Sequence, residues 1–423
     1  MSTADGGVAQ SFAALSRRDL AVLVPELLLC GQLIDRSGMA HLISAFGREG
    51  MAEVAIEEWQ ASSPPWYTRR MQRALGYEGD DVVTIFKGLQ LDIGAPPPQF
   101  MDFRYRVDDA NHGGVLARPL RCAHGCGAAR RRLRDIDVPR HRGSDVRCDR
   151  AGHQSARQVR PIHRPPRRPE DRHPHCAWTV VIDPSHVPPK MEPHTEALGR
   201  SAAVAVELSP IDPADDGNAD YAGPLLSDVR FGDFSRSALV RIAEEVCLQQ
   251  HLLTLGFLSG VRKRTDEESA LAITRKQLTG IAGGLTSERI RKALGLPGDL
   301  DGLATVLSVH PMFAPQQYVH RDIRFDGQRL ELRIRRSGGA HTDGAWPALV
   351  DGEHLEALNA LVRGVDPHFS VRVVAEDADA LIVEVIVESA PAKECGEVAI
   401  TRFSSGSSFV FADRGIPLPL TVV

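Results

Sequence analysis

The chain carries one stretch of sequence twice, and this repeat limits its fold more than any other feature does. Residues 68–80 read TRRMQRALGYEGD, and residues 287–299 read SERIRKALGLPGD. At the same ungapped offset of 219 residues, LAVLVPELLLCGQ from Leu20 lies over LVRIAEEVCLQQH from Leu239. We therefore expect a tandem duplication of one folding unit.

Length and composition agree with two globular domains. A chain of 423 residues exceeds the size at which a single core keeps growing, and its 43% apolar and 25% charged residues are ordinary. The formal net charge of −5 argues against a specific nucleic-acid partner for the whole chain. Abundant Arg, Ala and Gly with little Lys suggests a bacterial source.

Cysteine usage and hydropathy favour a cytoplasmic protein without a membrane partner. Seven scattered cysteines, an odd number, do not resemble a disulfide framework. The N-terminus lacks the pattern of a signal peptide. The most apolar run, residues 20–30, contains Pro25 and Glu26 and falls short of the ~20 residues of a membrane span.

Hydrophobic periodicity predicts helices first and strands later in each repeat, an α+β unit. Helices are predicted at residues 20–33, 39–60, 66–75 and 80–93, and again at 237–276, 287–294, 301–309 and 353–362. Strands are predicted at residues 100–107 and 173–183, at a hairpin over 322–336 that turns at Asp326-Gly327, and at 368–374 and 380–387. Each repeat is therefore expected to end in a small antiparallel sheet.

These elements give the predicted domain boundaries. The first repeat should span residues 12–184, and the second should span residues 228–390. Residues 185–227 are predicted to be a linker with one strand at 202–208. Residues 391–423 are predicted to be a strand-like tail.

Residues 114–156 do not fit this pattern, because they contain ten arginines, no lysine and almost no apolar periodicity. One interpretation is a basic nucleic-acid-binding loop. A second is a zinc site formed by Cys122, His124, Cys126 and Cys148, although zinc prefers two paired Cys elements. A third is translation in a shifted reading frame, which would leave these residues without a selected role and the first repeat short of one or more strands. Back-translated residues 114–127, read from the second base, permit the apolar string AFWLAHCGALMDVE.

The densest group of reactive side chains is PEDRHPHCAWTVVID at residues 169–183. Cys176 with His173 and His175 could form a thiol–imidazole pair for nucleophilic catalysis. Alternatively, Cys176 begins a buried strand and the histidines lie in an exposed turn. The matching strand of the second repeat has neither His nor Cys, as expected for one catalytic and one structural copy.

Four further residues are candidates for substrate binding. Trp66 and Arg70 could form an aromatic and cationic wall for a carboxylate, or the solvated face of an amphipathic helix. Asp102 and Arg104 recur as Asp322 and Arg324, which fits either a binding role or structural ion pairs. The chain has no P-loop, G-x-G-x-x-G, G-x-S-x-G or H-E-x-x-H motif, so no cofactor or metal is assigned.

Over residues 17–183 the first repeat resembles the L-2-amino-thiazoline-4-carboxylic acid hydrolase family. The resemblance lies in helices around FGREGMAEVAIEEW, a following strand of the type MDFRYRV, and a cysteine-bearing segment. It implies hydrolysis of a cyclic C–N bond in a small amino-acid-derived substrate, with the cysteine-bearing strand as the functional centre. Two alternatives stay open: a non-catalytic sensor holding a small apolar or anionic ligand between the repeats, and a product without activity. The expected partner is a small molecule in each functional case, and the oligomeric state is open.

Overall fold

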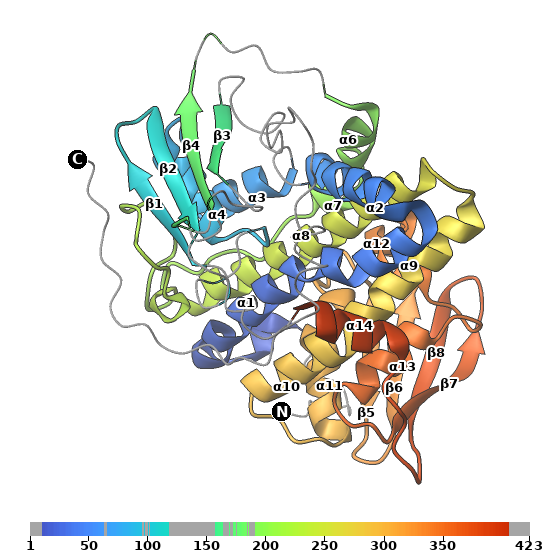
Figure 1. The fold of residues 1–423 in the computed structure, drawn as a ribbon. Helices are drawn as coiled ribbons and strands as arrows, with labels where there is room; N and C mark the ends of the chain where they lie inside the picture. The colour runs from blue at the N-terminus through green and yellow to red at the C-terminus, as the bar shows by residue number, and fades with distance from the viewer. Residues whose placement is uncertain are drawn as a thin grey trace.

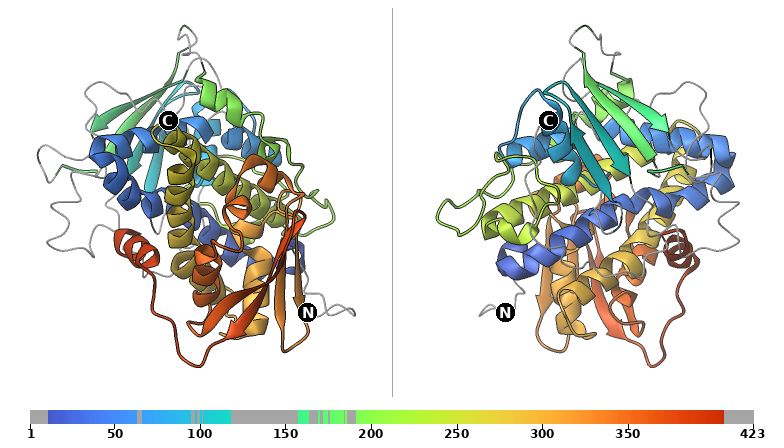
Figure 2. Two further views of the ribbon diagram at one scale, coloured as in Figure 1. Left: turned by 90° about the vertical axis from the view of Figure 1, so that its right-hand side faces the viewer. Right: turned by 60° about the vertical axis from the view of Figure 1, so that its left-hand side comes forward.

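The computed structural model describes residues 11–62, 66–94, 97, 100, 102–117, 157–163, 169, 172–174, 176–183, 185 and 191–405. Within these ranges the fold is mixed α+β, with two separate four-stranded antiparallel sheets that each follow a helical region. The long helices of both repeats pack together, and the two sheets lie on different sides of them (Figures 1 and 2). The predicted fold class is therefore confirmed.

The helices and strands that the two repeats share follow each other in the same order. The first repeat has α1 (Arg17–Gln32), α2 (Ile34–Ser62), α3 (Thr68–Ala74), α4 (Val82–Gln90), β1 (Phe103–Val107), β2 (His112–Ala117), β3 (Arg157–His163), β4 (Cys176–Ile182) and α6 (Pro193–Leu198). After α7 (Ala202–Ala205), the second has α8 (Arg236–Arg262), α9 (Glu267–Ile281), a π-helical segment (Ala282–Ser287), α10 (Glu288–Ala293), α11 (Leu300–Val309), β5 (Arg321–Phe325), β6 (Leu330–Arg335), α12 (Gly339–Asp343), α13 (Glu356–Arg363), β7 (Phe369–Glu376), β8 (Ala380–Val387) and α14 (Gly396–Ser405).

Local signals recur at equivalent positions of the two repeats. Ser16 caps α1, and Ser235, 219 residues later, caps α8, each by accepting a backbone N–H three residues on. Gly76 and Gly295 follow α3 and α10 with φ of 62° and 63°, the left-handed conformation that glycine adopts without strain. The duplication therefore extends to the residues that begin and end the helices.

The sheets share one topology. Their strand orders are β1-β2-β4-β3 and β5-β6-β8-β7, and all neighbours are antiparallel. In the first sheet alternate residues of β1, Phe103, Tyr105 and Val107, pack in the core formed with α4. The ring of Tyr105 lies 5.0 Å from that of Phe86 on α4. One face of each sheet thus covers helices of its own repeat.

Equivalent hydrogen bonds join the two repeats at the start of their first helices. Arg17 donates through Nε to the carbonyl oxygen of Phe234 at 2.7 Å. Arg236, its equivalent, donates through Nε to the carbonyl oxygen of Leu15, the equivalent of Phe234, at 2.9 Å. Each repeat therefore gives the other the same contact, as the two subunits of a C2 dimer do.

Two buried ion pairs repeat this exchange deeper in the interface. Arg70 Nε of α3 lies 3.0 Å from Glu245 Oε2 of α8, and Arg289 Nε of α10 lies 2.5 Å from Glu26 Oε2 of α1. Burial raises the pKa of Glu245 to about 7, and the bonded Arg70 opposes that rise. Burial likewise raises the pKa of Glu26, against the effect of Arg289. Each arginine thus compensates a carboxylate that the other repeat buries.

The interface has also lost symmetry at matched positions. Gly38 of α2 has Phe257 of α8 as its equivalent, and a Cβ at Gly38 would meet the Phe257 ring at 2.6 Å. Glu58 has Gln277 as its equivalent, and both are buried. A glycine faces a phenylalanine at the first pair, and an acid matches an amide at the second, so the two repeats now differ at equivalent interface positions.

Two predicted strands are helices. Residues 202–205 form α7, because Asp343 accepts hydrogen bonds from the backbone N–H groups of Ala202 and Ala203 at 2.9 and 3.0 Å. In the predicted strand-like tail, residues 396–405 form α14, which buries Val398 and Thr401, three residues apart. In both places tertiary contacts override the strand preference of β-branched residues.

Helices α6 and α14 lie beyond the predicted ends of the two repeats. Each follows the last strand of its repeat and packs back on that repeat's helix, α6 on α2 and α14 on α9. The segment predicted as a linker and the segment predicted as a tail therefore both contain the closing helix of a repeat.

The first sheet has all four strands, so the expectation that this repeat lacks a strand is wrong. Residues 114–117 belong to β2, and β3 begins at Arg157. Residues 118–156 lie outside the described residues, as do the proposed zinc ligands Cys122, His124, Cys126 and Cys148. The frameshift, loop and zinc interpretations therefore stay predictions.

Loss of one interface arginine should destabilise the whole chain. Arg70→Met leaves the fully buried Glu245 without its partner, which typically costs about 3–5 kcal/mol. Chemical denaturation of the full chain measures this loss. Arg106→Met is the control, because its ion pair with Asp108 is 56% exposed at the arginine and such pairs contribute at most about 1 kcal/mol. A loss for Arg70→Met no larger than the control's would show that the pair does not hold the repeats together.

Glu58 should make stability depend on pH. Burial, followed by repulsion from Asp35, raises its pKa well above 4.5, and the nearby Gln277 amide offsets part of the rise. The folded state therefore holds this proton to higher pH than the unfolded state, and stability falls as pH rises through the folded pKa. Glu58→Gln should be more stable than the parent at pH 8, with the difference shrinking towards pH 5. Thermal unfolding across this range tests it, with exposed Glu49→Gln as control; parallel profiles for parent and Glu58→Gln would contradict it.

Candidate functional site

The structure places the predicted catalytic residues at the start of β4. Cys176 is the first residue of the strand and is half-buried, and His173 is exposed in the preceding turn. His175 lies outside the described residues. Cys176 pairs with Ala117, which pairs with Phe103, and cross-strand partners point to the same face. Cys176 therefore faces the α4 side of the sheet.

Arg104 and Asp102 form an ion pair away from that face. Their charged atoms lie 2.6 Å apart, and Arg104 also contacts Asp228 at 3.3 Å. Because neighbouring residues of a strand alternate in direction, Arg104 points to the face opposite Phe103 and Cys176. The structure thus joins Asp102 with Arg104 but does not bring Arg104 to Cys176.

Trp66 and Arg70 contact other parts of the chain. The indole N–H of Trp66 donates to the carbonyl oxygen of Thr195 in α6 at 3.0 Å. Besides its ion pair, Arg70 donates to the carbonyl oxygens of residues 204 and 206 at 2.6 and 2.9 Å. Both side chains hold helices and linking segments in place at positions separate from β4.

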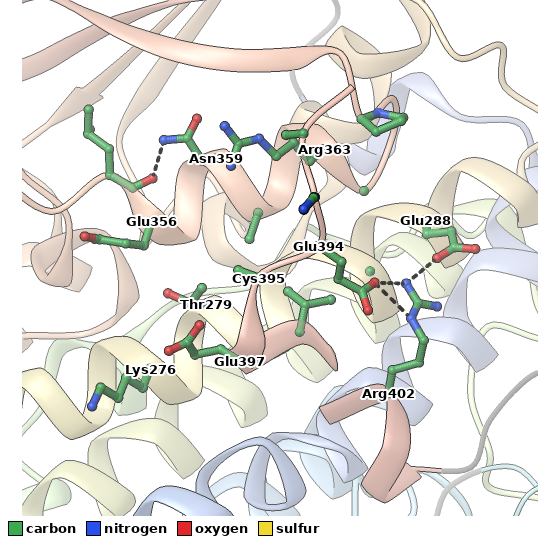
Figure 3. Close-up of a pocket in the computed structure, with 18 of the residues that line it drawn as sticks. Lys276, Thr279, Glu288, Glu356, Asn359, Arg363, Glu394, Cys395, Glu397 and Arg402 are labelled. Atoms are coloured by element: carbon green, nitrogen blue, oxygen red, sulfur yellow. Dashed lines mark hydrogen bonds and ion pairs between the residues drawn. The ribbon is translucent and has the colours of Figure 1, made fainter. Parts of the chain in front are cut away.

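A pocket of about 840 Å³ lies within the second repeat, a size usual for small-molecule sites. Its walls come from α9 with the π-helical segment and α10, from α13, and from residues 392–402 (Figure 3). The sensor alternative expected a ligand between the repeats. In this pocket, in contrast, every lining residue lies between positions 272 and 402 and thus in the second repeat.

Glycines in the π-helical region allow the walls to approach closely. A Cβ at Gly283 would meet Ala360 of α13 at 2.5 Å, and a Cβ at Gly284 would meet Val398 of α14 at 2.9 Å. Gly280, one turn earlier, lies under the backbone of α14, where a Cβ would meet the Glu397 carbonyl oxygen at 3.0 Å. π-Helical turns are frequent at functional sites. This glycine seat, Gly280, Gly283 and Gly284, positions α13 and α14 on either side of the pocket.

Sequence reasoning missed this site although a signal was present. The glycine seat occurs in TGIAGG at residues 279–284, and the equivalent stretch of the first repeat reads QASSPP. At the aligned offset, glycine 280 replaces an alanine and glycines 283 and 284 replace two prolines. A comparison of the repeats for lost or gained glycine would have singled out the second copy.

Ion pairs close one side of the pocket. Arg402 of α14 contacts Glu288 at 3.0 Å and Glu394 at 2.9 Å (Figure 3). Glu288 also pairs with Lys292. Burial alone would raise the pKa of Glu288, but hydrogen bonds from Lys292 and Arg402 bring it below its ordinary value. These four side chains therefore neutralise one another.

Two half-buried arginines in the pocket are bonded to backbone carbonyls instead. Arg363 Nε donates to the Phe369 oxygen at 3.2 Å, and Arg291 Nη1 donates to the Leu296 oxygen at 3.3 Å. Within the part of the chain that the structure describes, neither has a carboxylate within salt-bridge distance. The positive charge of Arg363 is thus available to a ligand, whereas that of Arg291 lies near Asp366.

Cys395 lines the pocket at the start of α14 and is half-buried. Burial raises the pKa of its thiol and Glu397 raises it further, while backbone hydrogen bonds, chiefly that of Val398, offset part of the rise. A thiol in this state is a weak nucleophile at neutral pH. The arrangement favours binding over covalent chemistry.

No known protein family, curated protein or solved structure matches this chain. Among the described residues, no three or more His, Cys, Asp or Glu side chains are grouped so that they could hold a metal ion. In the same ranges no helix is both long and apolar enough to cross a bilayer.

Gly284→Ala should loosen α14, because the new methyl group would displace Val398 and Arg402. We expect a thiol reagent to modify Cys395 several-fold faster in this variant, as measured by peptide mass spectrometry of the full chain. Gly223→Ala is the matched control, since a Cβ there meets no atom within 4 Å. Equal Cys395 rates in parent, variant and control would contradict the glycine-seat account.

Proposed function

We propose that this protein binds a small molecule without converting it, and that the site is the pocket of the second repeat. The observation that carries the proposal is a space of about 840 Å³ whose lining combines apolar side chains with arginines that make no ion pair in the described residues. Ligand sites typically combine such an apolar wall with a few oriented polar groups.

The placement of the reactive groups supports binding rather than turnover. Burial raises the pKa of the thiol in the pocket, Cys395, and Glu397 raises it further. In the first repeat, Trp66 and Arg70 are bonded to neighbouring segments, and Arg104 faces away from Cys176. The first repeat therefore serves as the scaffold that buries the helices under the site.

Hydrolysis of a cyclic C–N bond at Cys176, which the family resemblance implies, is the competing proposal. It rests on the order of elements in the first repeat, and the experiment that follows separates it from binding.

Thermal unfolding of the full chain with a panel of small carboxylates, amines and neutral amides should identify stabilising compounds. A ligand at 100 times its Kd stabilises by about 2.7 kcal/mol. Cys176→Ala should keep this stabilisation, and a thiazoline carboxylate should not be consumed. Turnover of the thiazoline carboxylate that disappears in Cys176→Ala would overturn the binding proposal in favour of the hydrolase.

A further inference from the structure

The charges lining the pocket identify the class of ligand. Four cationic side chains of the lining have no ion pair within the described residues: Arg291, Arg363, Lys276 and Lys393. Three acidic ones are likewise without an ion pair: Glu353, Glu356 and Glu397. Four positive and three negative charges leave an excess of one positive charge, which matches a monoanion.

The half-buried side chains of the pocket show the same balance of charge as the whole lining. Both arginines are half-buried, whereas Lys276, Lys393 and two of the glutamates are exposed at the rim, so Glu397 is the one half-buried acid of the set. An anion held by a half-buried guanidinium gains a charge-assisted hydrogen bond in a medium of lower dielectric than water. The inner part of the pocket therefore carries the same single excess of positive charge.

Arg363 is the better placed of the two arginines. It projects from the last turn of α13, one turn after Asn359, and the two side chains lie next to each other above the 392–395 segment (Figure 3). Its Nε is fixed by the Phe369 carbonyl oxygen, which leaves the terminal nitrogens for a ligand. Arg291, in contrast, is close enough to Asp366 to lower the pKa of that carboxyl.

The remaining wall is apolar. Val365, Ala360 and Val398 are buried around the pocket, and Leu355, Pro367 and Ala392 extend the same lining. A ligand that fills this space needs an aliphatic or aromatic body beside its charged group.

We infer that the pocket takes an organic monocarboxylate, whose carboxylate binds Arg363 and whose apolar body packs against Val365 and Val398. The inference rests on the proposed binding function and names its ligand class. A phosphate dianion fits less well, because the excess is one charge and Glu397 faces the same space.

Calorimetric titration of the full chain with 4-methylpentanoate tests the inference. The neutral isostere 4-methylpentanamide should bind at least about ten-fold more weakly, since one charge-assisted hydrogen bond is lost. Arg363→Gln should weaken 4-methylpentanoate binding by a similar factor, whereas Arg372→Gln, a surface arginine of β7, should bind like the parent. Added salt should weaken the carboxylate more than the amide.

The outcomes separate this inference from the proposed function. Equal affinity for carboxylate and amide would overturn the anion assignment and leave a small-molecule site standing. Tighter binding of butyl phosphate than of 4-methylpentanoate would overturn the carboxylate class. Absence of binding by all three probes would overturn the inference, and the broader panel then decides the proposed function. The comparison of the two ligands on the parent chain needs no variant, so it holds even where Arg363→Gln fails to fold.

Discussion

Two exchanged ion pairs between the repeats, Arg70 with Glu245 and Arg289 with Glu26, set the constraint on which this structure depends. A carboxylate buried among helices is costly unless a cation compensates it. Here each repeat buries one glutamate, and the other repeat supplies the arginine that pairs with it. The long helices of the two repeats bury one another, with α1 and α2 packed against α8. The two repeats thus contact each other as the subunits of a C2 homodimer do, although both belong to one chain.

The joined repeats have since diverged on either side of that interface. Gly38 faces Phe257, and Glu58 faces Gln277, so the surfaces now distinguish one repeat from the other. The larger difference lies at the end of the second long helix. The first repeat closes there with Trp66 bonded to α6, and the second places α13 and α14 on the glycine seat. The pocket follows from this local change in one copy.

Much of this architecture could be predicted from the sequence, because the two repeats can be compared with each other at matched positions. Caps such as Ser16 and the turn at Asp326-Gly327 are local signals, and local contacts decide them. Helix α7 could not be predicted from its own sequence. The side chain that accepts hydrogen bonds from its first backbone N–H groups is that of Asp343, which lies well over a hundred residues away. Helix α14 resembles a strand in sequence because Val398, Ile400 and Thr401 are β-branched, and its contact with Gly284 is visible only in three dimensions. The pocket depends on such contacts between residues far apart in the sequence. The motifs with reactive side chains therefore pointed to β4 instead.

Our central proposal is that the second repeat carries a ligand site on a shared helical scaffold. Hydrogen–deuterium exchange of the full chain, with and without 4-methylpentanoate, tests it most directly, because exchange reports which segments a ligand protects. The account predicts protection in residues 356–365 and 392–402 and unchanged exchange in residues 176–182. Protection centred on residues 176–182, or none in the second repeat at saturating ligand, would contradict it.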